Sequence, residues 1–255
     1  MKLIFLGTGT SVGVPTIGCK CRVCMSKAPH DKRLRCSALV EHGNTRILID
    51  PGPDFRQQML SQPYRKIDAV LLTHIHYDHA GGIDDLRPFC KFGEINVYAD
   101  NITSEALVNT MPYCFADNDY PGVPKINLVG LKHHIPLHVN ELEVIPFEVM
   151  HGNLPITAYR IGGLAYITDM KTINEYEMDF LRDVDTLVVN ALRYAPDHHS
   201  HQSVDDAVSF AEKVGARKTF FIHCCHDIGL HSEVNKKLPP DMQLAFDGQE
   251  VEVFC

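Results

Sequence analysis

Hydrophobic and polar positions along the chain follow two different periods. Short runs rich in β-branched and aromatic residues, each bounded by Gly, Pro, Asn or Asp, predict strands. These runs cover residues 2–7, 37–42, 46–50, 69–73, 95–99, 141–149, 156–161, 164–168, 186–190 and 218–223. Apolar residues that recur near a period of 3.6 predict helices. The helical segments cover residues 52–62, 102–111, 173–184, 203–216 and 232–238.

Two pairs of predicted strands lie too close together in the sequence for a helix between them. Gly43 and Asn44 lie in one connection, and Gly162 and Gly163 lie in the other. Both pairs are therefore predicted to be β-hairpins. Hairpin-rich sheets with helices outside them indicate an α/β fold, a four-layer αββα sandwich. Periodicity alone also allows another layered α/β arrangement, so the chemistry has to decide.

Composition indicates a globular protein. A chain of 255 residues with 45% hydrophobic content can bury a full core. We expect one domain over residues 1–255 rather than a string of modules. The apolar run at the N-terminus is too short for a signal peptide, and no later run approaches membrane-spanning length. A cytoplasmic location without membrane contact is therefore expected.

The charge balance bears on the class of substrate. A formal net charge of −8 disfavours a broad nucleic-acid-binding face. A local basic group of Lys27, Lys32, Arg33 and Arg35 is still expected to be able to meet a small phosphate. The expected partner is thus a small molecule, and a homodimer is compatible with the sequence.

The segment "LLTHIHYDHAGGIDDL", residues 71–86, carries four metal-ligand side chains within six positions. His74, His76, Asp78 and His79 directly follow a predicted strand, where α/β proteins commonly build sites. Imidazole suits zinc, manganese or iron, and the alternation at 74, 76 and 78 directs side chains to one locus while His79 can serve a second. The alternative is that these polar residues only cap a helix that begins near Asp84.

Three other predicted strands also end in metal-ligand side chains. His151 follows "VIPFEVM", Asp169 follows "LAYIT", and His223 ends "KTFFIH". Taken singly, each would more often be an ordinary loop residue. Three such strand ends beside the first cluster favour a dinuclear site.

Cys19, Cys21 and Cys24 form a C-x-C-x2-C cluster. Without a secretory signal, such spacing favours metal binding over disulfides, and three thiolates need one more ligand for a closed tetrahedral zinc. We predict that His226 is the fourth ligand, because it lies three residues after His223. The open alternatives are Cys225, Cys224, Cys36, His30, or a set of unliganded thiols.

The H-x-H-x-D-H motif, together with "LGTGTS" near the start and "FIHCCHD" near the end, resembles the metallo-β-lactamase superfamily over essentially the whole chain. The resemblance implies that Asp169 bridges two metal ions and that Asp50 braces the site from outside. It implies these ligands: His74, His76 and His151 for the first ion, and Asp78, His79 and His223 for the second.

Within the superfamily, "GVP", "GCKCRVC" and the later H-x-x-H are similar to the PhnP group, phosphodiesterases of phosphoribosyl 1,2-cyclic phosphate. The "RCS" at 35–37 and "SHQSVDDAV" at 200–208 also fit. This resemblance implies that His201 lies over the scissile phosphate, with His198 and His199 as competitors for that role.

The expected function is hydrolysis of a small, cyclic ribose phosphodiester by a metal-activated hydroxide. Two divalent manganese or zinc ions are expected there, and one structural zinc at the cysteines. Asp78 would orient the nucleophile, and His201 would stabilise or protonate the leaving oxygen. The alternatives are a tRNA 3′-processing endonuclease and a non-catalytic metal-binding relative of a cofactor-biosynthesis protein. The distal part of the substrate is expected to meet loops at 111–124 and 190–201.

Overall fold

The computed structural model describes residues 1–115 and 122–255, and within them the strands form two seven-stranded sheets. In spatial order, the first sheet contains β14 (Glu250–Glu252), β1 (Lys2–Gly7), β2 (Ser37–His42), β3 (Thr45–Ile49), β4 (Ala69–Leu71), β5 (Ile95–Ala99) and β6 (Ile126–Gly130). The second contains β13 (Met242–Leu244), β12 (Lys218–Ile222), β11 (Thr186–Asn190), β10 (Leu164–Ile167), β9 (Leu154–Ile161), β8 (Leu142–His151) and β7 (Leu137–Val139).

Each sheet combines an antiparallel hairpin region with a parallel region. The predicted hairpins are confirmed as the antiparallel pairs β2–β3 and β9–β10. The pairs β3–β4, β4–β5 and β5–β6 are parallel in the first sheet, and β10–β11, β11–β12 and β12–β13 are parallel in the second. Parallel strands end at one edge, so the loops that leave β3, β4, β10 and β12 can meet there.

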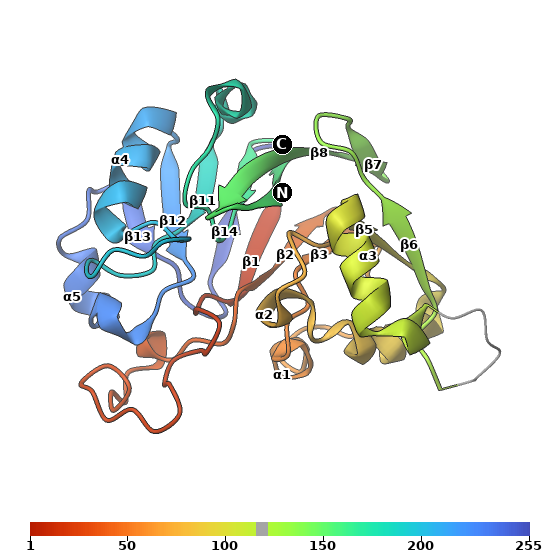
Figure 1. Cartoon of the computed structure of the whole chain (residues 1–255), viewed down its shortest axis with the longest axis horizontal. Coiled ribbons are helices and arrows are strands. Elements are labelled where there is room, and N and C mark those ends of the chain that lie inside the picture. The colour runs from red at the N-terminus through yellow and green to blue at the C-terminus, as the bar shows by residue number, and fades with distance from the viewer. Residues whose placement is uncertain (116–121) are drawn as a thin grey trace.

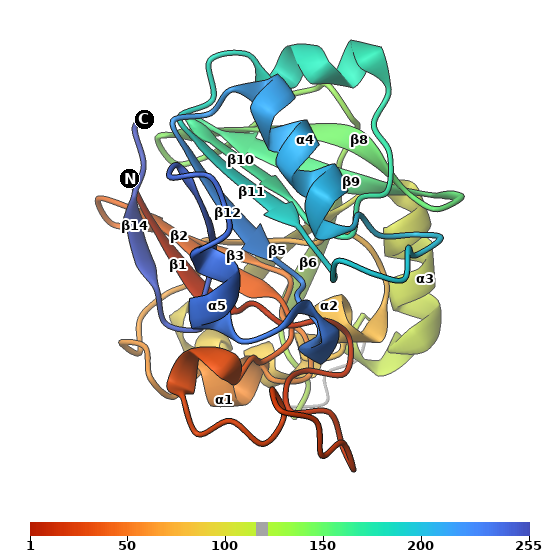
Figure 2. The same cartoon turned by 90° about the vertical axis from the view of Figure 1, so that its left-hand side faces the viewer.

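Helices cover the outer faces of the two sheets, so the chain forms four layers (Figures 1 and 2). The helices are α1 (Phe55–Met59), α2 (Tyr77–Ala80), α3 (Asn101–Thr110), α4 (Val204–Val214) and α5 (His231–Asn235). One buried cluster, which includes Phe5, Tyr159 and Phe220, fills the space between the sheets. Two further clusters lie beneath the outer helices. The expected αββα sandwich is confirmed.

Some predicted elements differ from the structure. The segment 173–184 forms a 3-10 helix only over Glu175–Leu181, and the segment 52–62 is helical only over α1. The strands β14, β6, β13 and β7 were not predicted, and they are the four edge strands. Three of them are only three residues long, and an edge position weakens the hydrophobic pattern on which prediction depends.

The helices are short in the part of the chain that the structure describes, and none of them has the length and apolar character needed to cross a membrane.

Candidate metal centre

The predicted ligands lie at strand ends that hold an unusual backbone conformation. Asp50 follows β3, Asp169 follows β10 and His223 follows β12, with φ values of 53°, 55° and 57°. A non-glycine residue at positive φ costs about 1–2 kcal/mol. Such residues cluster at functional sites, where the surrounding structure holds them in place. The fold therefore uses conformational strain to direct these three side chains.

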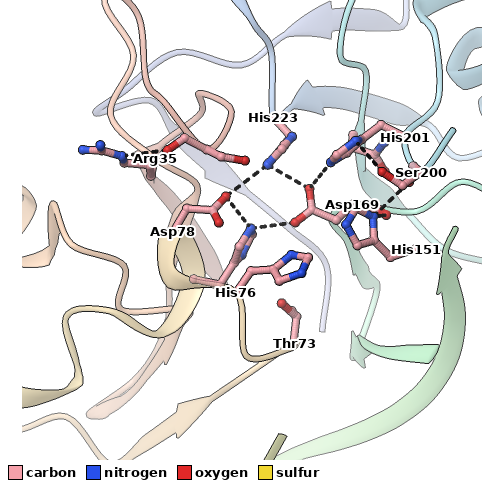
Figure 3. Close-up of polar contacts among 12 residues, drawn as sticks. Arg35, Thr73, His76, Asp78, His151, Asp169, Ser200, His201 and His223 are labelled. Carbon is pink, nitrogen blue, oxygen red and sulfur yellow. Dashed lines mark hydrogen bonds and ion pairs between the residues drawn. The ribbon is translucent and has the colours of Figure 1, made fainter. Parts of the chain in front are cut away.

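The structure brings the predicted ligands together in two groups. His74, His76 and His151 form one, and Asp78, His79, Asp169 and His223 form the other, with the ligand atoms of each group within 4.8 Å of one another. Figure 3 shows Asp78, Asp169 and His223 pointing toward one another.

Asp169 joins the two groups. Its Oδ2 lies 3.5 Å from Nε2 of His74 and 2.6 Å from Nε2 of His79. Its Oδ1 lies 2.8 Å from Nε2 of His223. Asp169 therefore contacts residues of both groups, and its bridging of two ions stays a prediction.

The capping alternative does not fit the geometry. The helix α2 begins after His76, and the 3-10 helix Ile83–Phe92 begins after Gly82. Neither N-terminal cap residue makes a side-chain hydrogen bond to its helix. The side chains of the motif are directed into the cluster instead.

Hydrogen bonds at Nδ1 fix three of the imidazole rings. His79 Nδ1 donates to Asp50 Oδ2 at 2.8 Å, and His74 Nδ1 lies 2.9 Å from the Thr73 hydroxyl. His151 Nδ1 lies 2.7 Å from the carbonyl oxygen of Asp169. Partners of this kind orient metal-binding histidines and leave Nε2 for the metal.

The charge and the unsatisfied polar atoms of the clustered His and Asp side chains also fit an ion-binding site. Burial opposes ionisation of Asp169, but His223 and His79 hold its pKa well below the usual range. Within the described residues, Nε2 of His79, Nε2 of His223 and Oδ1 of Asp169 are buried and lie close together, yet none of them makes a hydrogen bond of suitable geometry. Converging buried polar atoms that cannot satisfy one another are suited to divalent ions.

Asp50→Asn is expected to weaken metal binding at this centre by about 10–100-fold, because Asp50 orients His79 through a charged hydrogen bond. Competition with a chelator would measure the affinity. Retention of the cysteine-bound metal in the same variant is the control, and an unchanged affinity at the His/Asp centre would contradict the bracing role.

The cysteine cluster forms a separate group with His226. Cys19, Cys21, Cys24 and His226 offer ligand atoms within 4.8 Å of one another. Backbone N–H groups donate to the sulfur atoms of Cys19, Cys21 and Cys24. The hydrogen bond from the Cys24 backbone is the main cause that lowers the pKa of Cys21 to about 6, whereas burial raises the pKa of Cys24 to about 11. Thiolates are the form that binds zinc, so Cys21 is the readiest ligand of the three before a metal binds.

Cys225, Cys224, Cys36 and His30, the open alternatives for the fourth position, lie outside the group that Cys19, Cys21, Cys24 and His226 form. The ring of His30 stacks on Phe246 at 3.9 Å. Cys36 and Cys224 are fully buried, and Cys224 forms backbone hydrogen bonds with Thr8 and Thr10. All nine cysteines are unpaired in the described part of the chain. The geometry therefore favours His226 as the fourth ligand.

Cys21→Ser is expected to remove about one zinc per chain and to lower the melting temperature, because a closed tetrahedral zinc contributes to folding. Activity should fall mainly through misplacement of His223, three residues from His226. Metal analysis and thermal unfolding measure the two effects. If both were unchanged, the cluster would consist of plain thiols.

The expected phosphate-binding basic group does not form a common surface. Arg33 is buried, and it donates to the Ala245 carbonyl oxygen at 2.6 Å. Arg35 pairs with Asp54 and points away from the cluster, as Figure 3 shows. Lys32 donates to the Cys24 carbonyl oxygen. These three side chains brace the N-terminal loop, so the prediction is wrong for Lys32, Arg33 and Arg35.

His201 lies beside the two groups without belonging to either. Its Nε2 is 3.3 Å from Asp169 Oδ1, and its ring stacks on His223. Burial lowers the pKa of His201 to about 4, although Asp169 acts in the opposite direction. His199 is exposed, and His198 contacts the far side of the His201 ring. Of the three candidates, His201 alone adjoins the predicted bridging ligand.

Two supporting residues escaped the sequence analysis. Thr73 donates twice to Asp50, from its backbone and its hydroxyl group. The Asn190 side chain holds the loop after Asp169 through two hydrogen bonds to Met170. It accepts from the Met170 backbone N–H and donates to the Met170 carbonyl oxygen. Thr73 directly precedes His74, so its position in the sequence could have identified it as a supporting residue. Asn190 is brought beside Met170 only by the fold.

A model of the beta-lactamase superfamily domain matches residues 45–224, more than half of the chain. The chain belongs to this superfamily. The match includes both predicted metal-ligand groups and ends at the residue after His223. The chain is therefore a hydrolase-family member with the metallo-β-lactamase fold and His/Asp clusters that can hold metal.

Two relatives resemble this superfamily member over nearly its full length. A crystal structure described as a new diphosphatase from the PhnP family has 41% sequence identity and a TM-score of 0.91, covering 98% of this chain and 97% of the other. An octanoyltransferase from Porphyromonas gingivalis is 44% identical over 251 residues. That match covers 98% of this chain but 51% of the relative, so the chain spans about half of that protein's length.

The crystal structure of Zn(2+)-bound PqqB from Methylobacterium extorquens has 18% identity and a TM-score of 0.79, and covers 99% of this chain and 100% of the other. At that identity the likeness establishes the fold alone.

Proposed function

We propose that this chain is a metal-dependent phosphodiesterase that hydrolyses a small phosphodiester, with a cyclic ribose phosphate as the substrate class. One observation carries the proposal. His201 directs Nε2 to Asp169, the residue that joins the two ligand groups, yet it belongs to neither group. An imidazole in that position is available to the substrate rather than to a metal ion.

The proposed centre holds two divalent ions, manganese or zinc, on the seven His and Asp ligands. When bound, the ions supply an activated water and polarise the phosphoryl oxygen. Asp78 stays ionised, since His79 and His223 hold its pKa below the usual value against the effect of burial. It can therefore accept a hydrogen bond from the attacking water. His201 donates from Nε2 toward the charge that develops on the leaving oxygen.

A diphosphate is the second candidate substrate class. The 41% identical relative is described as a diphosphatase, and the same residues would serve attack on either kind of phosphorus centre. The octanoyltransferase is about twice as long as the part that matches this chain. We therefore propose only hydrolysis for this chain and carry over no acyl transfer from that relative.

A substrate panel tests the proposal. Turnover of bis(p-nitrophenyl) phosphate with added manganese distinguishes an enzyme from a metal-binding scaffold. Cyclic ribose phosphates, a nucleoside diphosphate derivative and a tRNA precursor then distinguish the phosphodiesterase, diphosphatase and endonuclease. Preferential hydrolysis of the cyclic phosphates is expected, and cleavage confined to the tRNA precursor would overturn the assignment.

A further inference from the structure

The loop before α4 places a second histidine against His201. Nδ1 of His198 lies 2.9 Å from Nδ1 of His201, on the side of the ring opposite to Asp169. The Ser200 hydroxyl lies 3.2 Å from His198 Nδ1 and 3.3 Å from His201 Nδ1. His201 therefore has contacts at both ring nitrogens.

We infer that His198 is a positioning residue that holds the His201 ring with Nε2 on the side of Asp169, where the leaving oxygen of the substrate would lie. The inference rests on the proposed function, in which His201 acts on the leaving oxygen. The role is not one of binding metal, because His198 belongs to neither ligand group.

The contact between the two rings requires one proton. One of the two Nδ1 atoms carries the proton of this contact. The Ser200 backbone N–H also donates to Nδ1 of His198, at 3.4 Å. These contacts fix the orientation of the His201 ring, with Nε2 on the side of Asp169.

The backbone gives His198 a fixed location from which to act. The Ser200 carbonyl oxygen lies 2.9 Å from Nδ1 of His151, and the Gln202 N–H donates to the Met170 carbonyl oxygen. A Cβ atom at Gly152 would lie 3.3 Å from Cβ of Ser200, so the loop packs closely on the turn after β8. The loop that carries His198 is therefore fastened to a predicted metal ligand and to the residue after Asp169.

Replacing His198 with Asn or Gln distinguishes a role in hydrogen bonding to His201 from a role in packing alone. Asn at position 198 places a hydrogen-bonding atom near the Nδ1 position, whereas Gln places one near the Nε2 position. His198→Ala is expected to lower kcat for a cyclic ribose phosphate by about 10–100-fold with little change in KM. His198→Asn should recover most of that loss, and His198→Gln should not. His199→Ala is the matched control, because His199 is exposed and is expected to keep wild-type kcat.

The inference is overturned if His198→Ala keeps kcat within twofold of wild type, or if the Asn and Gln variants are equally active. A spectroscopic measurement tests the positioning role of His198 even if the proposed phosphodiesterase function proves wrong. Long-range 1H–15N correlation spectra of the zinc-loaded protein report which nitrogen of His201 carries the proton. His198→Ala should change the ring-nitrogen signals of His201, and His198→Asn should restore them. Should the wild type hydrolyse no phosphodiester, an unchanged His201 spectrum in His198→Ala would still refute the positioning role.

Discussion

Asp169→Ala is expected to lose the metal ions of the His/Asp centre and hydrolysis together. Activity should fall by about 10³-fold or more, whereas replacing a residue that only hydrogen-bonds to a metal ligand typically costs about 10–100-fold. Asp169 contacts both ligand groups, at 3.5 Å from His74 and 2.6 Å from His79. Its removal takes one ligand from its own group and removes the carboxylate that lies beside His74 of the other group. Metal analysis and steady-state kinetics on the same preparation measure the two effects.

Backbone strain could also contribute, since Asp169 has a φ of 55°, and Ala tolerates that region poorly. Asp169→Asn is the companion variant, because Asn is more tolerant of positive φ and keeps the side-chain shape. Both variants should retain the zinc at the cysteines. Two ions at the His/Asp centre with full activity in either variant would refute the bridging role.

His201→Ala should keep its full metal complement and lose about 10²–10⁴-fold in kcat on substrates with a poor alkoxide leaving group. The kcat for a p-nitrophenyl ester should fall much less, because the phenolate departs readily without a hydrogen-bond donor. Kinetics on a cyclic ribose phosphate and on bis(p-nitrophenyl) phosphate provide the comparison.

The two possible failures of the His201 prediction have different meanings. An equal loss on both substrates would remove the leaving-group role, and a loss of metal would make His201 a ligand. His199→Ala is the neighbouring control, since the exposed His199 ring packs at a tilt against His198 rather than against His201.

The interior of the fold was predictable because its strands are buried. The runs at β1, β5 and β11 are apolar and β-branched, and the hairpins carry Gly in their turns. The edge strands were missed because they are partly exposed, and three of the four have only three residues, so they carry little hydrophobic pattern. The 3-10 segment Glu175–Leu181 has apolar spacing close to that of an α-helix, so periodicity alone could not separate the two.

The location of the centre follows from ligand residues at strand ends, which is a local signal. His226 could be chosen because it lies close in sequence to His223. The supporting contacts are different, since Asn190 and His198 act through segments that only the folded chain brings together. The basic residues at 32–35 led to a wrong prediction of a phosphate-binding surface. Their partners, among them Ala245 and Asp54, are distant in sequence and could not be foreseen. Charge in a sequence does not reveal whether a side chain is buried.

The most direct test of the account is a metal titration of the protein after treatment with a chelator, with hydrolysis of a cyclic ribose phosphate followed at each addition. We expect two ions to bind at the His/Asp centre beyond the zinc at the cysteines, and activity to rise with their occupancy. A protein that binds both ions yet hydrolyses neither the cyclic phosphate nor bis(p-nitrophenyl) phosphate would contradict the proposed phosphodiesterase.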